Sequence, residues 1–140
     1  MQFKHVIGQH ELKKHLIEEV KHEKVSHAQL FLGNAGYGGL PLALSFVQYL
    51  FCEHKGETDS CGTCPSCHKV QELQHPDLHF SFPSITEKPG SKNLSSNFIE
   101  EWREFVNGYP YGNVFDWLQF IKAENKQGNI SADECNEIIR

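Results

Sequence analysis

The chain has 140 residues, enough for one folded domain with a core of its own. Hydrophobic residues make up 39% of it and charged residues 22%, as in an ordinary globular protein. The net charge of −5 argues against an autonomous nucleic-acid-binding protein, which usually carries a basic surplus. No apolar run approaches the ~20 residues that span a bilayer, and the N-terminus lacks the apolar core of a signal peptide. We therefore predict a cytoplasmic protein with no membrane partner.

The first 51 residues predict a helix, a strand, a glycine-rich loop and a second helix, in that order. Residues 10–24 carry apolar side chains at helical spacing, and residues 28–32 form an apolar run typical of a buried strand. Residues 40–51 are apolar on most sides, as expected for a helix packed against a sheet.

The loop between the strand and the second helix has the frame of a phosphate-binding loop without its functional residues. Such a loop reads Gly-x-x-x-x-Gly-Lys-Ser/Thr, and Gly33 and Gly38 have this spacing. Gly39 stands in the place of the lysine, and Leu40 replaces the magnesium-binding hydroxyl. Pro41 has no backbone N–H to offer to a phosphate. We expect no ATP binding here; an ordinary glycine-rich turn is the alternative interpretation.

Five cysteines in a chain without an export signal argue against a disulfide framework. Four of them have the spacing of metal ligands: Cys52, Cys61, Cys64 and Cys67. Overlapping Cys-x-x-Cys steps let thiolates on one tight turn reach the same ion, and four ligands predict a closed, structural zinc site. Free thiols or a redox pair are the alternatives, but a redox pair leaves two cysteines unexplained. Nearby side chains that offer an alternative ligand to a cysteine are His54, His68, His75 and His79.

The second half of the chain predicts a strand, an exposed loop and further helices. Residues 77–83 alternate apolar and polar side chains, and residues 83–94 are rich in Pro, Gly and Ser. Helices are expected over residues 69–74, from 95 or 96 to 107, from 114 to just before Gly128, and from Ser131 onward.

The last predicted helix begins with a capping box formed by Ser131 and Glu134. Cys135 falls on its apolar face, which predicts a buried thiol. The chain stops within this helix, so we expect it to be a piece of a longer protein.

Four features occur in a fixed order: Phe-Lys-His-Val-Ile-Gly-Gln at residues 3–9, His-Ala-Gln-Leu-Phe-Leu-Gly at residues 27–33, the altered loop, and the four cysteines followed by His-Pro-Asp. This arrangement resembles the N-terminal AAA+ domain of the clamp-loader subunits of bacterial DNA polymerase III. The missing Lys-Ser/Thr makes it most similar to the delta-prime type. The resemblance implies an α/β fold: a truncated AAA+ (P-loop NTPase-like) parallel sheet flanked by helices, with an inserted four-cysteine zinc module.

The same resemblance implies how the chain is organised and what it does. Residues 1–140 are expected to be the N-terminal part of an AAA+ domain, with a zinc module at 52–67 and a lineage-specific insertion at 83–128. The family's zinc ligands map onto the four cysteines one for one. The implied function is that of a non-hydrolysing structural subunit that helps load the sliding clamp onto primed DNA. Its implied partners are the gamma/tau and delta subunits and, through the assembly, the clamp and primer-template DNA.

Two other functions remain open at this point. One is an ATP-binding clamp-loader subunit of the gamma/tau type, against which Gly39 and Leu40 argue. The other is a zinc-containing nucleic-acid-binding module, against which the sequence pI of about 6.0 argues. We predict no catalytic residue in this chain.

Overall fold

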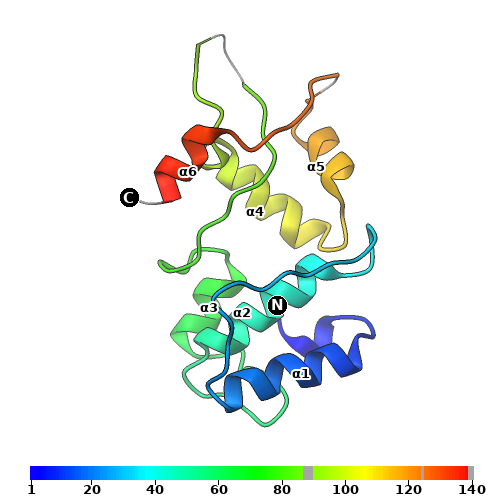
Figure 1. Ribbon diagram of the computed structural model, residues 1–140, viewed down its shortest axis with the longest axis vertical. Helices are drawn as coiled ribbons and strands as arrows, with labels where there is room; N and C mark the ends of the chain where they lie inside the picture. The colour runs from blue at the N-terminus through cyan, green and yellow to red at the C-terminus, as the bar shows by residue number, and fades with distance from the viewer. Residues whose placement is uncertain (87–89, 124, 139–140) are drawn as a thin grey trace. The chain divides into compact units, whose positions relative to one another are not determined.

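The computed structural model describes residues 1–86, 90–123 and 125–138, with residue 138 described by its backbone only (Figure 1). The chain divides into two compact units, Met1–His75 and Pro76–Arg140. Within the described residues, every helix is too short or too polar to cross a bilayer. Each unit has its own buried side chains, and the two are described in turn.

The first unit is helical. It consists of the 3₁₀ turn η1 (Phe3–His5) and the helices α1 (His10–Lys21), α2 (Gly39–Phe51) and α3 (Pro65–Gln71). Helix α2 contacts η1, α1 and α3 (Figure 1). The buried core consists of Phe3, Val6, Leu16, Ile17, Leu42, Phe46 and Tyr49. The helices predicted over 10–24 and 40–51 are therefore confirmed, although α1 ends early because Glu23 adopts a positive φ of 54°.

Helix α2 is buried on most sides, including two polar side chains that have no access to water. Ser45 donates to the carbonyl of Pro41 at 2.8 Å. Gln48 donates from Nε2 to the Ser60 hydroxyl at 3.0 Å, and its Oε1 accepts from the amino group of Met1 at 2.5 Å. Buried polar groups are costly unless they are hydrogen-bonded. The contacts of Gln48 therefore fix the loop at Ser60 and the N-terminal residues against this helix.

The predicted α/β fold with a parallel sheet is wrong for this chain: no β-strand forms in the part that the structure describes. The pairing found there is one isolated bridge, between Ser84 and Asn129. Residues 28–32 are extended, but they pair with no described strand, and Leu30 and Leu32 are 85% and 90% exposed. A strand is stable only where a neighbour takes its backbone N–H and C=O groups. An apolar run by itself does not supply that neighbour.

The strand predicted over residues 77–83 is also absent from the described structure. The N–H of Phe82 donates to the Ser95 hydroxyl at 2.9 Å, and that hydroxyl donates to the carbonyl of Phe82 at 3.1 Å. One serine thus occupies both backbone groups that Phe82 would need for a sheet.

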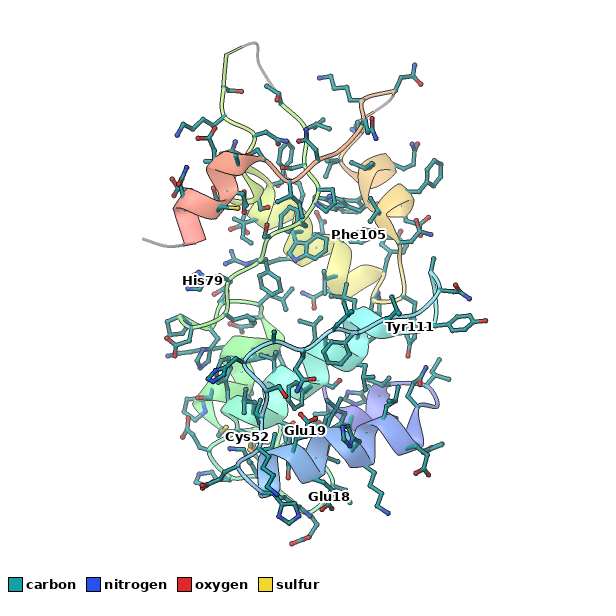
Figure 2. All side chains as sticks on the ribbon, in the orientation of Figure 1. Glu18, Glu19, Cys52, His79, Phe105 and Tyr111 are labelled. Atoms are coloured by element: carbon teal, nitrogen blue, oxygen red, sulfur yellow. The ribbon has the colours of Figure 1, made fainter. Side chains whose placement is uncertain are left out.

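The second unit contains a 3₁₀ turn η2 (Ser95–Phe98) and the helices α4 (Ile99–Gly108), α5 (Val114–Phe120) and α6 (Ala132–Ile138). Its core is an aromatic cluster, seen around Phe105 in Figure 2, that includes Phe82, Trp102, Phe105, Trp117 and Phe120. Trp102 stacks on Phe82 with ring centroids 4.3 Å apart, and Trp117 meets Trp102 edge to face at 5.1 Å. The indole N–H of Trp117 donates to the carbonyl of Pro83 at 2.6 Å.

In the second unit, the end of α5 and the start of α6 differ from the prediction. Helix α5 ends at Phe120, well before Gly128, and Lys122 follows with a positive φ of 54°. Helix α6 forms as expected, but Ser131 and Glu134 do not make the predicted capping box. Ser131 donates to the carbonyl of Asn93 at 2.6 Å, and the buried Glu134 carboxylate accepts from the Ser95 N–H at 2.8 Å.

Cys135 is exposed, contrary to the prediction of a buried thiol. The expected apolar face of α6 is occupied instead by Glu134, whose carboxylate is drawn inward to the backbone of Ser95. A specific hydrogen bond in the interior therefore sets the orientation of this helix.

We expect Trp117→Ala to destabilise the second unit by about 3–5 kcal/mol, because it removes a buried ring and leaves the Pro83 carbonyl without its donor. Both tryptophans of the chain lie in this unit, so the fluorescence of Trp102 during urea unfolding reports it. Phe115→Ala, in the same helix but at a side chain that is 68% exposed, is the matched control. Equal losses for the two variants would contradict the assignment of Trp117 to the core.

Candidate functional site

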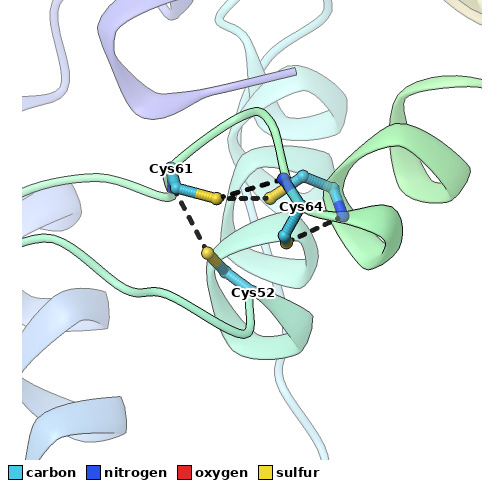
Figure 3. A group of neighbouring side chains, drawn as sticks. Cys52, Cys61 and Cys64 are labelled. Atoms are coloured by element: carbon cyan, nitrogen blue, oxygen red, sulfur yellow. Dashed lines mark hydrogen bonds between the residues drawn. The ribbon is translucent and has the colours of Figure 1, made fainter.

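In the first unit, the four cysteines predicted to be metal ligands lie close together. Cys52 caps the C-terminus of α2, Cys61 lies in the following loop, and Cys64 and Cys67 belong to the start of α3 (Figure 3). Their sulfur atoms all lie within 4.8 Å of one another. Three of the four side chains are buried, and Cys61 is partly exposed.

The spacing of the sulfur atoms fits a metal ion better than a disulfide. A Zn–S bond of ~2.3 Å in a tetrahedron places two sulfurs about 3.8 Å apart. The Sγ atoms of Cys61 and Cys67 are 3.9 Å apart. A disulfide requires about 2.05 Å, and all four cysteines are free. The cluster could therefore hold a metal ion.

Backbone N–H groups point at three of the four sulfur atoms, as the dashed lines in Figure 3 indicate. The N–H of Cys61 donates to Cys52 Sγ at 3.2 Å, and that of Cys64 donates to Cys61 Sγ at 3.3 Å. The N–H of Cys67 donates to Cys64 Sγ at 3.4 Å. Such hydrogen bonds favour the thiolate, which is the form that binds metals.

Burial has the opposite effect on the innermost thiols. It raises the pKa of Cys67 to about 12 and also raises the pKa of Cys52. Hydrogen bonds from the backbone N–H groups of Thr63 and Cys64 lower the pKa of Cys61 to about 6. Several thiolates in one buried cluster need a cation to offset their charge. A soft, four-thiolate set is the donor set typical of zinc.

Helix α3 completes the cysteine cluster and begins four residues earlier than the predicted helix at 69–74. Cys64 is its N-cap and Pro65 its first residue, a position that proline favours. The Glu53 carboxylate accepts from the hydroxyl and the N–H of Ser66, which lowers the pKa of Glu53. The Cys64-Pro65 pair was the sequence signal for this start.

Histidines take no part in the cluster within the described residues. His75 stacks on Phe51 with ring centroids 4.4 Å apart and planes 7° apart. His54, His68 and His79 are exposed.

The glycine loop adopts the turn that its sequence predicts, directly before α2. Gly38 is buried, has a positive φ of 87°, and accepts the first helical hydrogen bond, from Leu42 N–H at 3.0 Å. Helix α2 begins at Gly39, one residue earlier than expected, and Pro41 lies in its first turn. An α-helix leaves its first four N–H groups unpaired, and here proline removes one of them.

A cleft of about 520 Å³ lies beside this loop. Its walls come from α1, from residues 29–34 and from the start of α2, and the residues that line it include no lysine or arginine. His15 lines it and pairs with the Glu19 carboxylate at 3.0 Å, and the same carboxylate accepts from Gln29 Nε2 at 2.6 Å. The walls therefore offer no fixed positive side chain to a phosphate.

Comparison with known proteins shows the family to which this chain belongs. Residues 8–138 match the family described as "DNA polymerase III, delta subunit", and the chain belongs to this family. Its curated relatives are subunits of bacterial DNA polymerase III, named delta′ or tau/gamma. The predicted resemblance to clamp-loader subunits is thereby confirmed.

The individual relatives are similar over parts of their length. Subunit delta′ of Bacillus subtilis (strain 168) is 36% identical over 70 residues, covering 50% of this chain and 21% of the relative. Subunit tau of the same organism is 35% identical over 108 residues, which cover 77% of this chain and 18% of the relative. Subunit tau/gamma of Haemophilus influenzae is 32% identical over 96 residues, which cover 68% of this chain and 14% of the relative. The chain thus spans about a fifth or less of these relatives, and no solved structure matches it.

We expect Cys67→Ser to weaken metal binding by more than the roughly 100-fold that loss of an outer-shell partner costs, because it removes a fully buried sulfur donor. Titration with Co²⁺, followed by the thiolate-to-cobalt charge-transfer band, measures this. The matched control is Cys135→Ser, which changes the exposed fifth cysteine outside the cluster. An unchanged band in Cys67→Ser would show that this cysteine is not a ligand.

Proposed function

We propose that this chain is part of a non-hydrolysing, structural subunit of the DNA polymerase III clamp loader. Its task in that assembly is to help place the sliding clamp onto primed DNA by passing on movements of its neighbours through packed surfaces. Membership of the clamp-loader family supports the assembly, and the glycine loop supports the absence of hydrolysis.

The observation that carries the proposal is the chemistry at the start of α2. Gly39 and Leu40 occupy the positions where a working phosphate-binding loop has lysine and a hydroxyl. The cleft beside them is lined without lysine or arginine. Hydrogen bonds to charged groups contribute about 1.5–3 kcal/mol each, so the missing lysine alone weakens triphosphate binding by roughly 10- to 150-fold.

We further propose that the ion at the cysteine cluster is Zn²⁺, held by Cys52, Cys61, Cys64 and Cys67. When bound, the ion supplies four bonds that join the end of α2 to the start of α3, and no chemistry on a substrate. Four protein ligands fill a tetrahedral site, so its role is structural.

The remaining features of the proposal extend what the resemblance of the sequence to clamp-loader subunits implies. The partners are the gamma/tau and delta subunits and, through them, the clamp and primer-template DNA, in the cytoplasm. Residues 1–140 are the N-terminal part of an AAA+ domain with the zinc module at 52–67, and residues 83–128 are an insertion specific to its lineage.

A second candidate is an ATP-binding subunit of the gamma/tau type. The relatives named tau or tau/gamma match this chain over 108 and 96 residues, more than the 70 residues matched by the delta′ relative. This candidate requires a loop that binds triphosphate without its lysine.

A calorimetric titration with a non-hydrolysable ATP analogue and magnesium separates the two candidates. We expect no binding by the natural chain. The variant Gly39→Lys with Leu40→Thr and Pro41→Thr should gain at least ~10-fold in affinity, since it restores a charged donor, a hydroxyl and an N–H group. A Cβ at residue 39 meets nothing closer than the Phe31 carbonyl at 3.9 Å, so a side chain can start from this exposed position without a clash at its Cβ.

The matched control replaces Gly39 with glutamine in the same triple variant, which adds a side chain of similar length without charge. Tight, magnesium-dependent binding by the natural chain, or ATP hydrolysis by it, would refute the non-hydrolysing role and favour the gamma/tau type.

A further inference from the structure

The N-terminal residues of the first unit are held by the loop that carries Cys61. The two residues before this cysteine, Asp59 and Ser60, both contact the beginning of the chain. They are separated from it by more than fifty residues in sequence. The position of Cys61 therefore influences these contacts, together with the hydrogen bond from Gln48 to Ser60.

Asp59 binds the N-terminal turn with both carboxylate oxygens. Its Oδ1 accepts from the Phe3 N–H at 3.0 Å, and its Oδ2 accepts from the Lys4 N–H at 2.9 Å. A carboxylate that accepts two backbone N–H groups at the start of a turn satisfies donors that the turn itself leaves unpaired. Oδ1 also accepts from the N–H of Ser60, which orients the carboxylate.

Ser60 and Gly62 both lie against Gln2, the residue directly before the turn η1. The buried side chain of Gln2 donates to the Ser60 carbonyl at 2.6 Å. Gly62 lies so close to this side chain that a Cβ there would approach it to 2.9 Å. Gly62 also has a positive φ of 75°, so residue 62 suits glycine on both counts.

These contacts place a large apolar side chain in the core. Phe3 is buried against Tyr49 of α2, with ring centroids 5.9 Å apart. Val6 is also buried, and its carbonyl accepts from Lys13 Nζ of α1 at 2.5 Å. The N-terminal segment, residues 2–6, thus joins the cysteine loop to both α1 and α2.

We propose that a metal ion at the four cysteines clamps the N-terminal segment into the core of the first unit. The ion fixes Cys61, which positions Asp59 and Ser60, and these hold Gln2, Phe3 and Lys4. Without the ion the loop of residues 53–62 keeps its hydrogen bonds to Gln48 and Tyr49 but loses its anchor at Cys61, and the N-terminal segment loosens. This inference rests on the proposal that the cluster binds zinc.

Loss of the clamp also affects the cleft beside the glycine loop. Residues 2–6 are joined through residues 7–9 to α1, which forms one wall of that cleft, and Gln9 Nε2 donates to the Tyr37 carbonyl of the loop at 3.0 Å. Release of the segment therefore loosens this wall, although no cysteine lines the cleft.

Amide hydrogen exchange tests the clamp, with bound zinc measured on the same samples. The chain is compared before and after zinc removal by a chelator, in the presence of a reductant that prevents disulfide formation. We expect the exchange rates of the Phe3 and Lys4 amides to rise at least ~10-fold on zinc removal. The amides of α2 around Phe46 report whether the whole unit unfolds.

A second variant keeps the ion and removes the contact. Asp59→Ala should raise exchange at Phe3 and Lys4 by a similar factor while zinc stays at about one per chain, and Asp59→Asn, with one acceptor oxygen, should give a smaller rise. The matched control, Glu57→Ala, removes an acidic side chain of the same loop that is 94% exposed and pairs with Lys21.

The outcomes separate the clamp from the metal proposal. A chain purified without added metal that contains far less than one zinc refutes the zinc site. Zinc that binds and leaves without changing exchange at Phe3 and Lys4 overturns the clamp and leaves the zinc site intact. If zinc removal unfolds the whole unit, the zinc-bound Asp59→Ala variant decides: unchanged exchange overturns the clamp, and increased exchange supports it.

Discussion

The burial of α2 is the constraint on which the first unit depends. This helix contacts η1, α1 and α3, and its interior face includes two polar side chains that must be hydrogen-bonded. Gln48 meets this requirement through Ser60 and the amino group of Met1. Two segments that are distant in sequence are thereby brought to one side of the helix.

Both candidate sites are placed at the ends of this helix. Its N-terminus continues from the glycine loop, and its C-terminus is capped by Cys52. A helix that is packed on most sides is held rigidly along its length. The cysteine cluster and the cleft are consequently parts of one packed body, although they do not share residues.

In the second unit, aromatic rings form the buried core. Trp102 and Trp117 pack against each other and against Phe82 and Phe105. Its polar interior is organised by Ser95, whose hydroxyl and N–H bind Phe82 and Glu134. Because these hydrogen bonds join three separate stretches of chain, they set the orientation of α6 and take backbone groups away from any strand at Phe82.

The sequence by itself determined the local chemistry of this protein. The spacing of Cys61, Cys64 and Cys67 predicts ligands on one turn, and Gly39 and Leu40 predict a loop without phosphate-binding groups, because both depend on residue types a few positions apart. The periodicity of α1, α2 and α4 predicted helices for the same reason.

Only the tertiary structure decided which distant groups meet. The expected sheet is absent from the described residues because residues 28–32 find no strand there, and an apolar run looks the same with or without a partner. Ser131 and Glu134 bind Asn93 and Ser95 in place of capping their own helix. The hydrogen bonds from the Phe3 and Lys4 N–H groups to Asp59 also could not be predicted from the sequence. Nothing in the sequence distinguishes this aspartate from others in loops, because its partners are brought beside it only by the fold.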